Sequence, residues 1–447
     1  MNREHSLFWR IFYIAFPVAL QSLITTGVAA MDTLMIGNIS EVQLSAVAQG
    51  NQPYFLFSTT IFGLATGSTV LTAQYWGKGE LDPIRAIMGL ILRVGMIAGA
   101  LLGALVLAFP AAVMSIFTND PQVIASGVEF LRIIAFSYVF AAFTGVFLIS
   151  LRSMENVRVS LCIYGLSFAL NLVLHWVFIF GNLGAPRMEI RGAALATLIS
   201  RICESVMVLV YMYCIEKKVR FSLRDLFRPT RTYWFTVVRY SVPVLCSEMI
   251  WAVGISLQAV ITGRLGVSAL AAISFISMLQ ELAMVPVMGV GVAAGVITGN
   301  LIGQGKDDEA LRTSKTMMKI GVVFGIVVGL ILVLLRPVAP GFVAASPETA
   351  GIIRGMMFVA AYLLFCQSIN IVTLAGVLRG SGDTAFCAGV DAFIMVVFKL
   401  VLGFSSAFLL HFPPVWVYFL LSSDELGKLF FILPRMWGGK WIHHTTV

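Results

Sequence analysis

A few ionisable side chains lie inside otherwise apolar stretches of this sequence, and the first of them is Asp32. It stands in the run Ala29-Ala-Met-Asp-Thr-Leu-Met, shortly before Gly37. An ionisable residue within a membrane-spanning helix costs about 2.5–3.5 kcal/mol on insertion scales, so it is by default a candidate functional site. Asp32 could take up a proton, or transiently Na⁺, and release it in another conformation. The alternative is a carboxylate that faces water at the outer interface.

Other polar residues of the first half share a helical face. Asn171 and His175 are four residues apart and therefore lie on one side of a helix. His175 could titrate beside Asn171, or it could be a hydrogen-bonded packing residue.

The second half carries its own candidates. Glu248 precedes Trp251 by about one turn, and either a cation-binding role or a helix-packing hydrogen bond fits this position. The polar run from Gln367 to Asn370 could line a cavity. We therefore assign Glu248, Trp251, Gln367, Asn370 and Asp391 to a cation or substrate site.

Two pairs of opposite charge also fall inside apolar stretches. Arg201 and Glu204 are three residues apart and predict a structural ion pair. Asp391 and Lys399 are two turns apart, so they either pair through an intervening group or extend towards the interface.

The sequence patterns of several enzyme classes are missing. There is no phosphate-binding G-x-x-x-x-G-K-[ST] loop, no His-Glu-x-x-His, no Gly-x-Ser-x-Gly and no Cys/His cluster with metal-ligand spacing. We therefore expect no enzymatic activity, no cofactor and no structural metal, and an ion gradient as the energy source for uphill movement.

The composition identifies the elements that must position these residues. Of 447 residues, 59% are hydrophobic and only 12% are charged, and the mean hydropathy is +0.93. Soluble domains carry about 25% charged residues. The net charge of +8 does not indicate a nucleic-acid partner, because the basic residues are spread between apolar runs instead of clustering. The chain is therefore predicted to be an all-α polytopic membrane protein.

Twelve apolar runs are long enough to span a bilayer. Their centres lie near residues 22, 64, 98, 138, 170, 202, 251, 287, 328, 365, 398 and 424. The last contains Asp424, Glu425 and Lys428, so an interfacial helix is its alternative. On this map 22 of the 30 Lys and Arg residues fall on one side and 6 on the other. Because basic residues gather in cytoplasmic loops, both termini are predicted to be cytoplasmic.

The chain repeats itself at an offset of 226 residues. Pro17 matches Pro243, and the loop Gly77-Lys-Gly matches Gly303-Gln-Gly. Glycines at every fourth position recur from Gly95 and from Gly321, which predicts close helix packing. Six spans in each half make the repeats parallel, an architecture of transporters with sites near the interface between halves.

The repeat defines the predicted domains. We assign residues 1–215 to an N-lobe, 216–239 to a basic cytoplasmic linker and 240–447 to a C-lobe. Pro17 and Pro243 are matched helix breaks, and we predict that they act as hinges.

Several motifs resemble those of the multidrug and toxic compound extrusion (MATE) transporters, over essentially the whole chain. They are the run from Pro17 to Gly37 around Asp32, Gly77-Lys-Gly-Glu, Leu151-Arg-Ser, Asn171…Phe178-Ile-Phe-Gly, Gly192-Ala-Ala-Leu-Ala-Thr and Leu378-Arg-Gly-Ser-Gly-Asp-Thr. The resemblance implies a V-shaped pair of six-helix lobes, related by a pseudo-twofold axis along the membrane normal. It also implies exchange of H⁺ or Na⁺ for a cationic organic compound by alternating access.

The resemblance further implies that Asp32, Asn171 and Thr197 take part in cation coupling. Relatives often carry an Asp four residues after that Asn, where this chain has His175. An imidazole is a poorer ligand for a hard cation than a carboxylate, so H⁺ coupling, assisted by His175, is favoured over Na⁺. A seventh-span Glu in bacterial relatives leaves a second site at Glu248 open.

Two other functions are considered. A lipid-linked precursor flippase would need a strongly cationic cavity, but only Arg201 and Lys399 are bases within the spans. A non-transporting scaffold or receptor would not need carboxylates there. We therefore expect a monomeric exporter in the cytoplasmic membrane, with small organic cations, H⁺ or Na⁺ and the bilayer as its partners.

Overall fold

The protein is built mainly from helices. The computed structural model describes residues 3–37, 39–342 and 346–446, and the side chains of residues 3–6, 29, 30, 32 and 33 are outside that description. The α-helices are α1 (Arg3–Gly37), α2 (Glu41–Gly50), α3 (Gln52–Lys78), α4 (Leu81–Ala108), α5 (Pro110–Ser115), α6 (Pro121–Ile134), α7 (Ser137–Ser153), α8 (Val157–Phe180), α9 (Glu189–Val210), α10 (Arg231–Gly263), α11 (Val267–Gly303), α12 (Asp307–Leu335), α13 (Pro347–Asn370), α14 (Thr384–Ile394), α15 (Pro414–Ser422) and α16 (Asp424–Trp437). Short 3₁₀ turns (Asn182–Gly184, Leu223–Phe227, Ala339–Phe342) and π-helical segments (Tyr211–Ile215, Ile371–Leu378, Met395–Gly403, Ser405–Leu409) complete them. The described residues include no β-strand.

The helices are long enough to cross a bilayer. In the described ranges, ten helical segments meet the length and hydropathy required, and α6 with α7, bent by 56°, would make an eleventh. The predicted class, an all-α polytopic membrane protein, is confirmed. The twelfth predicted span, near residue 424, corresponds to two short helices, α15 and α16, in place of one long helix.

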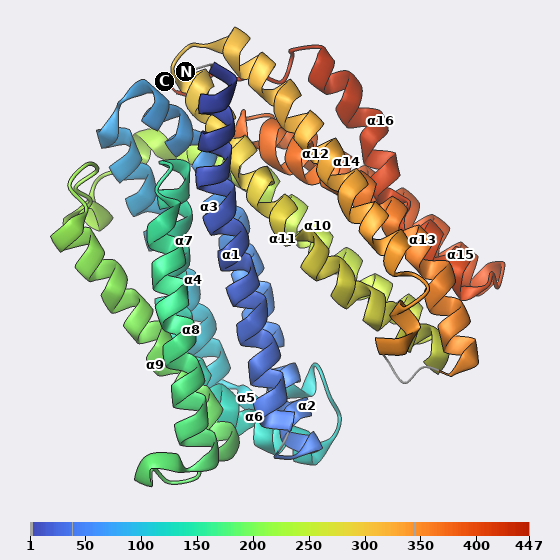
Figure 1. Ribbon diagram of the computed structural model, residues 1–447. Coiled ribbons are helices and arrows are strands. Elements are labelled where there is room, and N and C mark those ends of the chain that lie inside the picture. Colours follow the sequence, from blue (N-terminus) through green and yellow to red (C-terminus); the bar gives the residue numbers. More distant parts are fainter. Residues whose placement is uncertain (1–2, 38, 343–345, 447) are drawn as a thin grey trace. The chain divides into compact units, whose positions relative to one another are not determined.

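The chain folds into two compact units. Unit 1 contains Met1–Ala19, Thr69–Gly79 and Arg239–Val447, and unit 2 contains Leu20–Ser68 and Glu80–Val238. In unit 2, α4 packs along α7 and α8 along α9; in unit 1, α12 packs along α13 (Figure 1). The helices α1, α3 and α10 each contribute residues to both units.

The glycine rows predicted from the repeat lie at helix contacts. A Cβ atom on Gly99 of α4 would lie 3.0 Å from the carbonyl oxygen of Tyr138, and one on Gly325 of α12 would lie 3.0 Å from that of Phe365. Absence of a side chain therefore lets each helix backbone approach its neighbour. The predicted packing role of these glycines is confirmed in both units.

A second repeated contact joins α3 and α11 within unit 1. The carbonyl oxygen of Asn300 occupies the place of a Cβ on Gly77, and that of Gln74 occupies the place of a Cβ on Gly303. These residues are related by the 226-residue offset, 74 to 300 and 77 to 303. The two repeat-equivalent helices thus cross with a local twofold relation.

Residues near the C-terminus pack against this crossing of α3 and α11. The fully buried Gln74 side chain accepts hydrogen bonds from the Thr445 backbone N–H at 2.8 Å and hydroxyl at 2.9 Å, and donates to the carbonyl of His443 at 2.9 Å. Trp441 is fully buried, and its carbonyl accepts a hydrogen bond from Ser381 at 2.9 Å. Trp441 and Thr445 are therefore part of the packed interior of unit 1.

The α3–α11 crossing makes a prediction about stability. Gly303→Ala should destabilise the purified protein by about 1–3 kcal/mol, because the added methyl group overpacks a backbone contact. Gly351→Ala is the matched control: this α13 glycine has open space around its Cβ position. The control should be neutral or stabilising by up to about 1 kcal/mol, as Ala favours helix over Gly. Thermal unfolding in detergent measures both, and an unchanged midpoint for Gly303→Ala would contradict the close crossing.

Candidate functional site

Unit 2 encloses a chamber of about 640 Å³. This volume lies within the range of about 300–1,000 Å³ that is common for small-molecule sites. The chamber is bounded by residues of α1, α2, α3, α6, α7, α8 and α9. Its lining includes Ile24, Val28, Ile36, Asn51, Tyr54, Phe130, Ser137, Tyr164, Ser167, Phe168, Asn171, His175, Thr197, Arg201 and Glu204.

Three residues predicted for the N-lobe site meet in this chamber. Asn171 and His175 come from α8 and Thr197 from the neighbouring α9, and all three line the cavity. Nε2 of His175 lies 3.5 Å from the hydroxyl oxygen of Thr197, and His175 is only 1% exposed. The facing helices thus place a titratable ring beside a hydroxyl.

Asp32 belongs to α1, but its side chain is outside the described residues. Val28 and Ile36, four residues before and after it, both line the chamber. Because residues four apart share a helical face, position 32 lies on the face of α1 that borders the cavity.

An ion pair forms part of the chamber wall. Nη1 of Arg201 lies 2.9 Å and 3.1 Å from the two carboxylate oxygens of Glu204, so the predicted pair is confirmed. The hydroxyl of Ser167 on α8 donates to the same carboxylate at 2.6 Å. A smaller cavity of about 140 Å³ shares Tyr54, Tyr164 and the ion pair with the main chamber. The spacing of Arg201 and Glu204 predicts only a structural pair, although Thr197 and Arg201 are four residues apart on one helical face.

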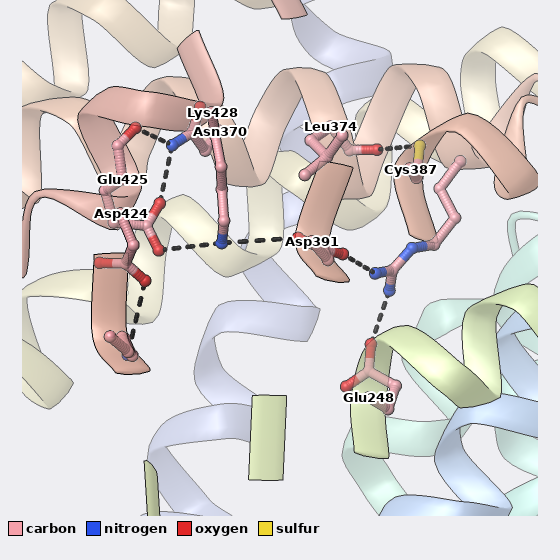
Figure 2. A network of polar contacts seen from close by, with 10 residues as sticks. Glu248, Asn370, Leu374, Cys387, Asp391, Asp424, Glu425 and Lys428 are labelled. Atoms are coloured by element: carbon pink, nitrogen blue, oxygen red, sulfur yellow. Dashed lines mark hydrogen bonds and ion pairs between the residues drawn. The ribbon is translucent and has the colours of Figure 1, made fainter. Parts of the chain in front are cut away.

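Unit 1 holds a chain of charged side chains that are largely shielded from solvent, each at most 15% exposed (Figure 2). Arg379, at the end of a π-helical segment, contacts Glu248 of α10 at 2.6 Å and Asp391 of α14 at 3.9 Å. Lys428 of α16 continues the chain, 3.5 Å from Asp391 and 3.3 Å from Glu425. Segments distant in sequence are thereby joined by alternating charge.

The far end of this chain is polar. The Asn370 side-chain amide donates to the carboxylate of Glu425 at 2.7 Å and to the Glu425 backbone carbonyl at 2.7 Å (Figure 2). Glu248, Asn370 and Asp391, all selected from the sequence, thus lie in one network. The sequence does not single out Arg379, Glu425 and Lys428 as site residues. Arg379 and its partners are 12 or more residues apart, and Glu425 and Lys428 fall in the span for which an interfacial helix is the alternative.

Lys399 does not pair with Asp391 as suggested by their spacing. Its ammonium lies 3.5 Å from Asp424 and 3.2 Å from the amide oxygen of Gln258. Lys399 sits in the π-helical segment Met395–Gly403, and the wider helical turn changes the face on which a residue emerges. Of the two roles that the spacing left open for Lys399, pairing with Asp391 or extension towards the interface, the structure shows neither, and Lys399 pairs with Asp424.

The charges of these groups do not balance. Glu248, Asp391, Asp424 and Glu425 are four carboxylates, whereas Arg379, Lys399 and Lys428 are three bases. With every group ionised, the network has one negative charge in excess.

The remaining predicted residues lie elsewhere. Trp251 is 46% exposed, and Gln367 is partly buried on α13; neither is among the described side chains that contact the charge network. Pro17 and Pro243 lie inside α1 and α10, and both helices continue through them, so neither proline ends its helix. In the described residues, no three His, Cys, Asp or Glu side chains gather closely enough to hold a metal ion.

The MatE family model matches residues 17–177 and 243–426, which is most of the chain. The chain belongs to this family of MATE transporters. The two matched segments begin 226 residues apart, at the offset found in the sequence. The chain is therefore a multi-pass membrane transporter, and the resemblance seen in its motifs is confirmed.

Known MATE proteins are similar over nearly the whole length. A probable multidrug resistance protein NorM of Thermotoga maritima is 25% identical over 83% of this chain and 79% of its own. A multidrug resistance protein MdtK of Yersinia enterocolitica is 23% identical over 96% of this chain and 90% of its own. A crystal structure of MATE in the bent conformation superposes with a TM-score of 0.86 at 18% identity, over 96% of each chain. These relatives are transporters, not enzymes, and the bacterial ones indicate the cell membrane.

The stability of this MATE transporter should depend on its charge network. Arg379→Gln should destabilise the protein by about 3–5 kcal/mol, because it leaves the buried carboxylate of Glu248 unpaired. The double variant Glu248→Gln/Arg379→Gln should recover much of this loss.

The matched control is the exposed pair of Glu129 and Arg191, 2.8 Å apart. Arg191→Gln should cost only about 0–1 kcal/mol. Thermal midpoints in detergent compare the four proteins. Equal effects of Arg379→Gln and Arg191→Gln would show that the network is not a buried, mutually dependent set of charges.

Proposed function

We propose that this protein exports organic, cationic compounds across the cell membrane in exchange for H⁺ or Na⁺, by alternating access and without a cofactor. The observation that supports this most is the chamber of unit 2, in which Asn171, His175 and Thr197 meet beside the face of α1 that carries Asp32. The names of the bacterial relatives, multidrug resistance proteins, support drug-like substrates.

The donor set of the chamber favours H⁺ as the coupling ion. Na⁺ is a hard cation that prefers oxygen ligands, and here an imidazole stands where relatives often have a carboxylate. His175 and Thr197, 3.5 Å apart, can accept and relay a proton to or from Asp32. Na⁺ at Asp32 is the alternative in this proposal.

The network of unit 1 supports a second coupling site. Because the network has one carboxylate more than it has bases, one carboxylate can take up a proton in one conformation and release that proton in another. Each base of the network still keeps a carboxylate partner. Glu248, Asp391 and Asn370 belong to this proposed site. Trp251 and Gln367 are proposed substrate contacts of the same half.

The flippase alternative has less support. A lipid pyrophosphate needs a cavity with several free cationic groups. Arg379, Lys399 and Lys428 each contact a carboxylate, and Arg201 is the only Lys or Arg among the described residues that line the unit 2 chamber. A scaffold or receptor would have no use for a charge network that can exchange a proton.

Topology follows from the same proposal. The N-lobe (1–215) and C-lobe (240–447), joined by the basic linker 216–239, would act as two moving bodies of a monomer, with both chain termini in the cytoplasm. Pro17 and Pro243 would act as the hinges of their helices.

The coupling ion can be tested in proteoliposomes loaded with a fluorescent cationic dye. A pH gradient alone should drive dye movement, and Asp32→Asn should reduce it to the level of empty liposomes. His175→Asp should add Na⁺-driven movement, because it supplies an anionic oxygen ligand beside Thr197.

His411→Asp is the control for the added charge, since His411 is exposed in unit 1. It should leave the preference for H⁺ unchanged. Dye movement driven by a Na⁺ gradient and absent under a pH gradient would reject proton coupling.

The hinge role predicts a kinetic effect. Pro17→Ala restores a backbone hydrogen bond in α1, so it should slow the transport cycle several-fold while dye affinity stays constant. Pro286→Ala, inside α11, is the matched control, because Pro286 has no counterpart at the repeat offset in α3. If the turnover rate of Pro17→Ala equals that of the wild type, Pro17 is not a hinge.

A further inference from the structure

The guanidinium of Arg201, in the wall of the unit 2 chamber, has hydrogen-bonding capacity that is not used up. Both of its bonds to Glu204 come from Nη1. Within the described part of the chain, its Nε and Nη2 groups make no hydrogen bond. The side chain is 26% exposed, and it lines both cavities of unit 2. Arg201 thus offers free N–H donors to the interior of the chamber.

Glu204, in contrast, is not available to a ligand. Its side chain is 4% exposed, and its oxygens accept hydrogen bonds from Ser167 and Arg201. Among the described residues that line the chamber, Glu204 is the only carboxylate. The polar group that this wall presents is therefore the base of the ion pair and not the acid.

The surrounding wall is aromatic. The ring of Tyr54 lies 6.0 Å from the guanidinium carbon of Arg201, and Tyr164, Phe130 and Phe168 line the same chamber. Flat apolar surfaces of this kind favour a flat, conjugated ligand. The chamber volume of about 640 Å³ is large enough for a drug-sized molecule.

We propose that Arg201 is a specificity-determining residue that binds a carboxylate of the transported compound. A guanidinium holds a carboxylate through two parallel N–H···O bonds. In Arg201 the Nε and Nη2 groups, which do not bond Glu204, can make these two bonds. The inference rests on the proposed export of organic cations and adds a second charged group to the substrate. Glu204 and Ser167 are then positioning residues that fix the orientation of Arg201.

Two dyes with one chromophore test this recognition. Rhodamine B carries a cationic xanthene and a carboxylate, and in its methyl ester the carboxylate is neutralised. Fluorescence anisotropy with the full-length protein in nanodiscs measures the binding of each. The wild-type protein should bind the acid at least tenfold more tightly than the ester, as expected for a charge-assisted hydrogen bond.

Variants locate the preference. Arg201→Gln/Glu204→Gln removes the pair without leaving an unpaired buried charge, and it should bind both dyes equally. Arg201→Lys keeps the ion pair but lacks the planar fork, and it should lose most of the preference while remaining folded. Arg191→Gln/Glu129→Gln removes a pair of the same charges outside the chamber lining, and it should keep the preference.

The outcomes separate the two proposals. Equal or tighter binding of the ester by the wild type, no saturable binding of either dye, or a preference that survives Arg201→Gln/Glu204→Gln overturns the role of Arg201. Gradient-driven movement in proteoliposomes is measured in parallel. Movement of the dyes without a preference for the acid leaves the exporter in place and removes this inference. Selective binding without movement under any ion gradient leaves the Arg201 site and removes the exporter.

Discussion

The pairing of buried charge is the constraint on which both units depend. In a hydrocarbon environment an unpaired ionised group is costly, so each one needs a partner or a function. In unit 2 the pair is local, Arg201 with Glu204 one turn later on α9. In unit 1 the pairs connect α10, α14 and α16 through Arg379 and Lys428. The same electrostatic requirement thus fixes side-chain orientation within one helix and the packing of several helices.

Close helix packing is the second requirement, and it comes from glycine. Without a hydrophobic drive between helices in lipid, association depends on close van der Waals contact. Gly77 and Gly303 allow α3 and α11 to cross backbone to backbone, and the C-terminal residues then bury Gln74 at that crossing.

The sequence predicted those features that are local or periodic. Hydropathy identified the helices, the 226-residue offset identified the repeat, and the spacing of Arg201 and Glu204 identified their ion pair. The network of unit 1 could be predicted only in part, because Glu248 and Arg379 are 131 residues apart and periodicity carries no information on such contacts. The spacing of Asp391 and Lys399 left two roles open, pairing through an intervening group or extension towards the interface. Lys399 contacts Asp424 instead, because it lies in a π-helical segment where the α-helical period does not hold.

The repeat also accounts for the short helices at the end of the chain. The insertion before Arg379 makes the offset 227, which relates Val210, the last residue of α9, to Trp437, the last of α16. The same offset relates Arg201 to Lys428, and Thr197 to Asp424. A basic residue thus stands at the same position of the repeat in both halves. Its carboxylate partner lies three residues after it in α9 and three residues before it in α16. Together, α15 and α16 are therefore the counterpart of α9, interrupted at Ser423. In the first half, Thr197 carries a hydroxyl and the guanidinium of Arg201 faces the chamber. In the second half, Asp424 stands at the position of Thr197, and the bases Lys399 and Lys428 pair with Asp424 and Glu425.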